Sequence, residues 1–150
     1  MARPKPPAAP TIALTPEDAE TAFYEAMASG DVGRMMSLWA DEEDVLCVHP
    51  GGGRVVGNAA VRASYETILA DGGIPVSYEA VHRLQRADVA VHHLVERIAV
   101  DTAQGRSELR MLATNVYLKT PLGWRIVAHH ATAAGPDDRP PPEPAPTTLH

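Results

Sequence analysis

Apolar residues in the first third of the chain recur at the spacing of helical turns, which predicts helices ahead of any strand. Thr15 can cap the first helix with its hydroxyl, and Pro16 suits the first helical position because no amide hydrogen is needed there. The stripe behind them is Ala19, Ala22, Phe23, Ala26 and Met27. Gly30 should end this helix and Asp31 should cap the next. Two consecutive helices are therefore expected.

A second apolar stripe supports the second helix, and a later capping residue predicts a third helix toward the middle of the chain. The apolar side of the second helix would be Val32, Met35, Met36 and Trp39. Residues 41–44 are acidic and break the helical pattern, and residues 45–49 have the composition of a short strand. After a glycine-rich turn, Asn58 can cap a third helix, whose inner face would be Val61, Tyr65, Ile68 and Leu69.

The second half of the chain consists of long β-rich segments joined by short turns. These segments span residues 75–86, 89–101, 107–119 and 124–132. Short connections favour an antiparallel meander, and helices followed by a run of strands are typical of the α+β class. The sheet must bury one face against the three N-terminal helices. A strongly bent antiparallel sheet that does so forms a cone-shaped fold with an internal cavity.

Two proline-rich segments flank this unit. Residues 1–10 contain four prolines and residues 136–150 contain six. Proline has no amide hydrogen and a fixed φ, so neither segment can enter a helix or the interior of a sheet. We therefore expect one domain over residues 13–134, between disordered tails at residues 1–12 and 135–150.

Charge and composition narrow the class of partner. The net charge of the 150 residues is -6, which argues against a nucleic-acid partner because phosphate binding needs a basic face. Lys and Arg are scattered, and no segment approaches the roughly 18 apolar residues of a membrane span. Cys47 is the single cysteine, so an intramolecular disulfide is impossible. With no signal-peptide pattern at its start, the chain is expected in the cytoplasm, without a nucleic-acid or membrane partner.

The order of these features resembles the nuclear transport factor 2-like superfamily over residues 15–133. The likeness rests on Trp39 before the acidic loop, residues 48–51, Gly57, residues 114–117, and residues 123–127 leading to His129 and His130. It is strongest to the SnoaL-like branch and to the association domain of calcium/calmodulin-dependent protein kinase II, although no kinase glycine-rich loop or catalytic-loop signature is present. The resemblance implies a cystatin-like fold and a homodimer formed through the outer face of the sheet.

The candidate site combines proton-transfer groups with polar and aromatic side chains. The expected catalytic residues are His130, His93 and His49, and the expected ligand-binding residues are Asn115, Tyr65, Trp39 and Tyr117. Histidine takes and gives protons near neutral pH. Tyr65 and Asn115 could hold a developing oxyanion on a carbonyl compound.

The alternation of side chains along a strand does not show which face of the sheet points inward, so the inward face is taken from the resemblance. Asn115 and His93 match pocket positions that carry arginine in the kinase association domain. The inner face should therefore carry Asn115 on one strand and His93 on the strand before it, with Glu96 opposite to His93. On the last strand, His130 should face inward and His129 should lie on the other face.

These residues leave more than one function open. The first is a small-molecule-binding pocket protein with an unknown ligand, acting as an isomerase, dehydratase or cyclase without a cofactor. The second is a non-enzymatic association module, and a third, a regulatory subunit, rests only on the proline-rich tails. A histidine of this kind is more often a hydrogen-bonded structural residue than a catalyst. No metal is expected, since no histidine pair has the i, i+4 spacing of helical zinc sites.

Overall fold

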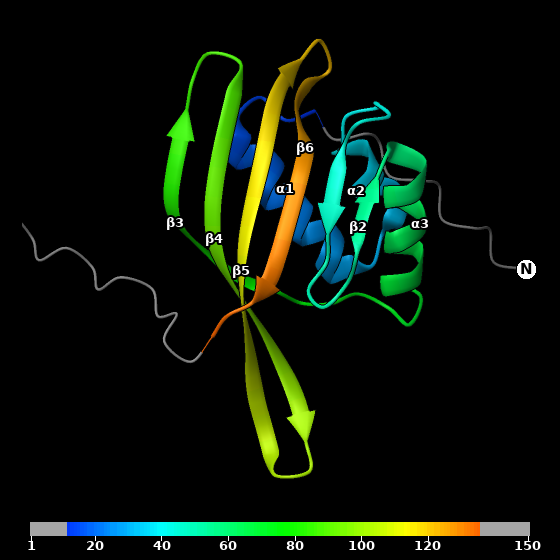
Figure 1. Cartoon of the computed structure of the whole chain (residues 1–150), viewed down its shortest axis with the longest axis vertical. Coiled ribbons are helices and arrows are strands. Elements are labelled where there is room, and N and C mark those ends of the chain that lie inside the picture. The colour runs from blue at the N-terminus through cyan, green and yellow to red at the C-terminus, as the bar shows by residue number, and fades with distance from the viewer. Residues whose placement is uncertain (1–11, 136–150) are drawn as a thin grey trace, which may run out of the picture.

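The computed structural model describes residues 12–135, which form three helices and a curled six-stranded sheet (Figure 1). The helices are α1 (Pro16–Ser29), α2 (Val32–Ser37) and α3 (Asn58–Ile68). The strands are β1 (Leu46–Val48), β2 (Arg54–Val56), β3 (Ser77–Gln85), β4 (Val89–Thr102), β5 (Gly105–Thr120) and β6 (Gly123–Ala133). The α+β class is confirmed. The tails expected at residues 1–12 and 135–150 lie outside the described residues, apart from Ile12 and Gly135.

Helix α1 begins and ends where its sequence signals predict. The Thr15 hydroxyl accepts a hydrogen bond of 3.0 Å from the amide of Asp18, and Gly30 ends the helix with a left-handed φ of 71°. The buried side of α1 carries the apolar stripe together with two polar residues, Glu20 and Tyr24. The helix therefore brings polar groups into the core as well as apolar ones. Within residues 12–135, no helix is long and apolar enough to cross a membrane.

The start of α3 differs from its prediction in one detail. Gly57, with a φ of 96°, occupies the capping position, and no side chain caps the helix there. Asn58 is the first helical residue, and its side-chain amide donates a hydrogen bond of 2.9 Å to the carbonyl of Ala40. Asn58 thus fixes α3 to the segment after α2. Val61 and Tyr65 are buried as predicted.

The sheet has the order β2-β1-β6-β5-β4-β3, and α1 lies across its inner face (Figure 1). Strands β3 to β6 form the predicted antiparallel meander. Strand β1, however, pairs with β6 in parallel, so the sheet is mixed rather than wholly antiparallel. The chain passes from β2 through α3 to β3 at the far edge. This crossover leaves β1 beside the last strand of the meander.

A β-bulge in β6 reverses the alternation of its side chains. Tyr117 pairs with Ile126, but Val116 pairs with Ala128, so Val127 is an extra residue in the strand. Before the bulge Ile126 faces the core, and after it the inward positions fall on odd-numbered residues, including His129. The prediction that His130 points inward and His129 outward is therefore wrong, because one inserted residue changes the face of everything after it.

Strands β4 and β5 continue beyond the rest of the sheet as a two-stranded hairpin (Figure 1). The last pair between β3 and β4 joins Ser77 to Arg97, and the last pair between β5 and β6 joins Met111 to Ala133. Residues 98–109, which we call the arm, pair in register only with one another among the described residues. At its base, Ile98 is paired with Leu109.

Candidate functional site

A cavity of about 300 Å³ lies between α1, α3 and the inner face of the sheet, at the base of the arm. Nine of its lining residues are apolar: Phe23, Met27, Pro50, Ile68, Ile74, Val76, Ile98, Leu109 and Met111. The other four are His49, Tyr65, Glu96 and His129. A few polar groups in an apolar hollow are typical of small-molecule sites.

Three of the polar side chains form a compact cluster. The ring centroids of His49 and Tyr65 are 5.0 Å apart with perpendicular planes, and those of His49 and His129 are 6.4 Å apart. Phe23 packs beside two of them, with its ring centroid 5.1 Å from that of His129 and 6.4 Å from that of Tyr65. Segments distant in sequence, namely α1, α3 and the ends of β1 and β6, therefore bring these groups to one wall of the cavity.

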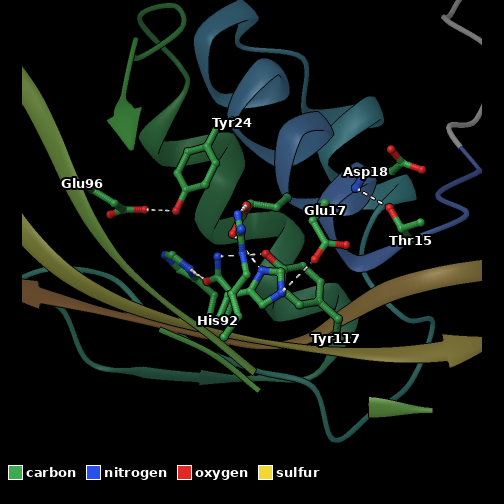
Figure 2. A network of polar contacts seen from close by, with 11 residues as sticks. Thr15, Glu17, Asp18, Tyr24, His92, Glu96 and Tyr117 are labelled. Atoms are coloured by element: carbon green, nitrogen blue, oxygen red, sulfur yellow. Dashed lines mark hydrogen bonds and ion pairs between the residues drawn. The ribbon is translucent and has the colours of Figure 1, made fainter. Parts of the chain in front are cut away.

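Glu96 faces the same cavity from β4. Its carboxylate accepts a hydrogen bond of 2.6 Å from the hydroxyl of Tyr24, which Figure 2 shows reaching it from α1. Burial raises the pKa of Glu96, and the hydrogen bond from Tyr24 partly offsets this by stabilising the charged form. Tyr24 is itself held by stacking on Tyr78, with ring centroids 4.1 Å apart. The acid is therefore fixed in orientation.

His129 is neutral and its tautomer is set by Asn115. The amide nitrogen of Asn115 donates to the Tyr117 hydroxyl over 3.2 Å, so its oxygen faces Nδ1 of His129 and accepts a hydrogen bond from it. Nε2 of His129 is then left with a lone pair. Burial, followed by the nearby His49 and His130, lowers the pKa of His129 to about 3.

His49 has the opposite tautomer. The Ser64 hydroxyl donates to the carbonyl of Val61 over 2.7 Å, so Nε2 of His49, 3.0 Å from the same hydroxyl, is the donor to it. Burial lowers the pKa of His49. The Cys47 sulfur is 3.5 Å from the same nitrogen, but burial raises the pKa of this thiol to about 12, so it is not an activated nucleophile.

A second polar network lies on the inner face but does not line the cavity (Figure 2). Glu20 on α1 accepts from Arg83 over 3.1 Å and pairs with Nδ1 of His92 over 2.8 Å. The ring of His92 lies 5.0 Å from that of Tyr117. This network joins α1 to β3 and β4. Across residues 12–135, no group of three or more His, Cys, Asp or Glu side chains is arranged to hold a metal ion.

The structure brings only some of the expected site residues to the cavity. His49 and Tyr65 line it, whereas Asn115 and Tyr117 are buried behind His129. Trp39 is buried with its ring 6.2 Å from that of Tyr65, and it does not reach the cavity wall.

His93 and His130 lie on the outer face of the sheet. In the β4–β5 register, His93 is opposite Thr114 and bonds to its hydroxyl over 3.0 Å, whereas His92 is opposite Asn115. Residues directly opposite in an antiparallel pair share a face, so the inward position on β4 belongs to His92. His130 is exposed after the bulge in β6. The expected inward placement of both side chains is therefore corrected.

Glu96 and His129 are the polar cavity residues that sequence reasoning missed. Both faces of β4 carry apolar residues, so alternation gave no preference for the face of Glu96. Asn115 was expected to point inward, and its partners on the two neighbouring strands are His92 and His129. Knowledge of this register would therefore have placed both histidines on the inner face. No residue type at the bulge marks it, since Val127 is a favourable strand residue.

Comparison with known proteins agrees with this architecture. The sequence profile of the SnoaL-like domain matches residues 17–135. No curated protein sequence matches significantly. A structure from Thiobacillus denitrificans, provisionally named as a calcium/calmodulin-dependent protein kinase type II association domain, is 34% identical, with a TM-score of 0.75 over 83% of this chain and 99% of that one.

Two further structures extend the comparison. A provisionally named dehydratase of the nuclear transport factor 2-like family from Streptomyces avermitilis is 33% identical, with a TM-score of 0.68 over 78% of this chain and 92% of that one. The hub of calcium/calmodulin-dependent protein kinase II from S. rosetta is 19% identical, with a TM-score of 0.61 over 79% of this chain and 93% of that one, and shares the fold. With the profile spanning most of the described chain and a cavity in its curled sheet, the chain belongs to the SnoaL-like family of nuclear transport factor 2-like proteins.

Proposed function

We propose that the protein binds a small carbonyl compound in the cavity and moves a proton on it without a cofactor, as an isomerase or dehydratase. The observation that carries this proposal is the Glu96 carboxylate, which is only 6% exposed and faces an apolar cavity. No Lys or Arg within residues 12–135 contributes to the lining. Burial raises the pKa of Glu96, which brings it closer to the range in which a carboxylate is an effective base near neutral pH.

In the proposed step, Glu96 removes a proton from the carbon next to the substrate carbonyl. The C–H electron pair forms a carbon–carbon double bond, and the carbonyl π pair moves onto oxygen to give an enolate. In an isomerisation, the protonated Glu96 returns the proton to a different carbon. In a dehydration, the enolate expels the hydroxyl group from the β-carbon, and the proton from Glu96 converts it to water. No electron leaves the substrate, so the step needs no redox partner.

Tyr65 is the proposed donor to the enolate oxygen. Burial raises the pKa of Tyr65 well above its usual range, so its hydroxyl keeps its hydrogen at neutral pH. The contact of this hydroxyl with the Cys47 sulfur, 3.9 Å long, is weak and easily exchanged for a substrate oxygen. The lone pair on Nε2 of His129 can accept a hydrogen bond from a substrate hydroxyl. His93 and His130 have no part in this step, since they lie on the outer face.

Proton transfer can be tested before the substrate is known. Wild-type protein is incubated in D₂O with a panel of ketones and β-hydroxy ketones, and deuterium uptake next to the carbonyl is followed by mass spectrometry. Glu96→Gln should lower the exchange rate at least about 100-fold, because an amide cannot take a proton but still accepts from Tyr24. His130→Ala, on the outer face, should keep the wild-type rate. Undiminished exchange in Glu96→Gln, or no exchange by the wild type across the panel, would contradict the proposal.

Association through the outer sheet face is the second candidate function. The observation in its favour is the likeness to the Thiobacillus denitrificans structure, whose provisional name is that of an association domain. In this chain the outer face of β5 carries the half-buried side chains Leu112, Thr114 and Val116, which suit packing against a second copy. We therefore expect a homodimer, which is compatible with catalysis in each subunit.

Light scattering tests the association directly. Thr114→Arg should convert the dimer to a monomer, because it places a charge at the centre of the packed face. Thr67→Arg, on the exposed side of α3, is the matched control and should remain dimeric. A monomeric wild type at micromolar concentration would contradict this candidate. Deuterium exchange by monomeric Thr114→Arg would separate catalysis from association.

A further inference from the structure

We infer that the cavity selects an uncharged molecule with a polar head and an apolar tail, which enters head first and is rejected when its head is a carboxylate. The inference rests on the proposed function in that it concerns the same cavity. It adds the charge, the orientation and the size of the ligand. Three independent observations carry it: the gradient of polarity along the cavity, the position of the nearby charges, and the volume.

Among the described residues of the lining, three of the four polar side chains are buried, whereas the two exposed residues, Pro50 and Leu109, are apolar. We call Glu96, Tyr65 and His129 the closed end of the cavity, and Ile98 and Leu109 its mouth. Glu96, Tyr65 and His129 are at most 6% exposed. Leu109, by contrast, is 51% exposed, and its cross-strand partner Ile98 is half-buried at the base of the arm. A ligand that matches both ends must therefore place its hydrogen-bonding group inside and its hydrocarbon toward the arm.

The charges near the cavity exclude an anion. Among residues 12–135, Glu96 is the only acidic residue of the lining, and the two lining histidines are kept neutral by burial, which lowers the pKa of each. The neighbouring Arg97 is engaged by Glu79 at 3.6 Å and by Glu108 at 3.3 Å, and it does not line the cavity. A carboxylate head would thus be desolvated beside Glu96, with no compensating cation among the described residues that line the cavity.

A cationic head is matched less well than a neutral one. An ammonium group has three hydrogens to donate and no lone pair, so burial requires several acceptors. The closed end offers the Glu96 carboxylate and the lone pair on His129 as acceptors, but attraction to a buried carboxylate offsets only part of the cost of removing an ammonium group from water. A carbonyl or hydroxyl head can accept from Tyr65 and still satisfy its neighbours.

The cavity volume sets the length of the ligand. A volume of 300 Å³ corresponds to about ten non-hydrogen atoms if each occupies the share of liquid volume that a water molecule does. Three probes of this size carry heads of different charge on an alkyl tail: 2-nonanone is neutral, octanoate is anionic and nonylammonium is cationic. Their binding to the full chain at neutral pH can be compared by isothermal titration calorimetry.

We expect 2-nonanone to bind the wild type at least about tenfold more tightly than octanoate or nonylammonium. Glu96→Gln removes the repelling charge and should raise octanoate affinity toward that of the ketone. Leu109→Asp should weaken 2-nonanone binding roughly three- to tenfold by making the mouth polar. Leu84→Asp is the matched control, since Leu84 is an exposed leucine of β3 that does not line the cavity, and it should bind as the wild type does.

Failure of this inference can be told apart from failure of the proposed function. Tighter or equal binding of octanoate or nonylammonium, or no binding of 2-nonanone, would overturn the inference. Deuterium uptake by 2-oxononanoate at a rate equal to that of 2-nonanone would also overturn it, while leaving the proton-transfer function intact. Binding of 2-nonanone with the expected charge selectivity, but without deuterium uptake by any ketone of the panel, would uphold the selectivity and contradict the proposed function.

Discussion

The hydroxyl of Tyr24 on α1 donates a buried hydrogen bond of 2.6 Å to the carboxylate of Glu96 on β4. These residues are 72 positions apart in the sequence, and the hydrogen bond joins α1 to a strand that lines the cavity. A phenol that donates to a buried carboxylate stabilises its ionised form. The same bond leaves the other carboxylate oxygen free of Tyr24.

Tyr24→Phe should shift the pH dependence of deuterium exchange. Without the donor, the pKa of Glu96, already raised by burial, should rise further, because nothing then offsets the burial. Exchange needs the carboxylate form, so the rise of the rate with pH should move to higher pH in the variant. A rate–pH profile measured from pH 4 to 9 on both proteins checks this. Profiles that superimpose would show that Tyr24 does not act on Glu96.

Acid should destabilise the fold through His129. Its pKa is about 3 in the folded state and about 6.5 in an unfolded chain, so the unfolded state binds the proton more tightly. The stability linked to neutral His129 is complete above pH 6.5 and is lost as the pH falls toward 3, by up to about 1.4 kcal/mol per pH unit. Urea unfolding at several pH values should give a shallower decline for His129→Leu. An equal slope in both proteins would contradict this.

Gly73→Ala should destabilise the loop before β3. A methyl group there would lie 1.9 Å from the carbonyl oxygen of Ala28, which belongs to the rigid end of α1. The clash should cost at least about 2 kcal/mol of unfolding free energy. Gly53→Ala is the matched control, since a methyl group there meets nothing within 4 Å. Because Ile74 follows directly and lines the cavity, Gly73→Ala should also weaken 2-nonanone binding.

Glu20→Gln should change stability but not proton transfer. Glu20 pairs with both Arg83 and His92 inside the protein and does not line the cavity. Removing its charge should cost about 1–3 kcal/mol, because both partners then lose a charge-assisted bond. Glu25→Gln, in an exposed pair with Arg34, should cost less than about 1 kcal/mol. Loss of deuterium exchange in Glu20→Gln would assign this network a part in the chemistry.

The helices and the meander could be predicted because their signals are local. Thr15 and Gly30 fix the ends of α1 through backbone geometry that needs no tertiary contact. Turn residues such as Gly123 separate strands whose composition is strongly β-forming. Each of these features depends on residues that are close together in the sequence, so it can be recognised from the sequence alone.

The site was predicted only in part, because it depends on register. His49 and Tyr65 were expected at a ligand site and do line the cavity. Which side chains of β4 and β6 point inward depends instead on which residues pair across the strands. The extra residue Val127 in β6 places His129, rather than His130, on the inner face. The parallel pairing of β1 with β6 is likewise a long-range contact with no local signature.

Hydrogen exchange in the arm should report whether a ligand occupies the cavity. Residues 98–109 have no neighbouring strand on either side within the described chain, so their amides should open at low free-energy cost and exchange with solvent quickly. A ligand packed against Ile98 and Leu109 must order the base of this hairpin in order to bind. Filling the cavity should therefore slow hydrogen exchange along the arm. By thermodynamic reciprocity, a second molecule that binds the ordered arm should strengthen ligand binding by the same factor by which the ligand strengthens its own binding.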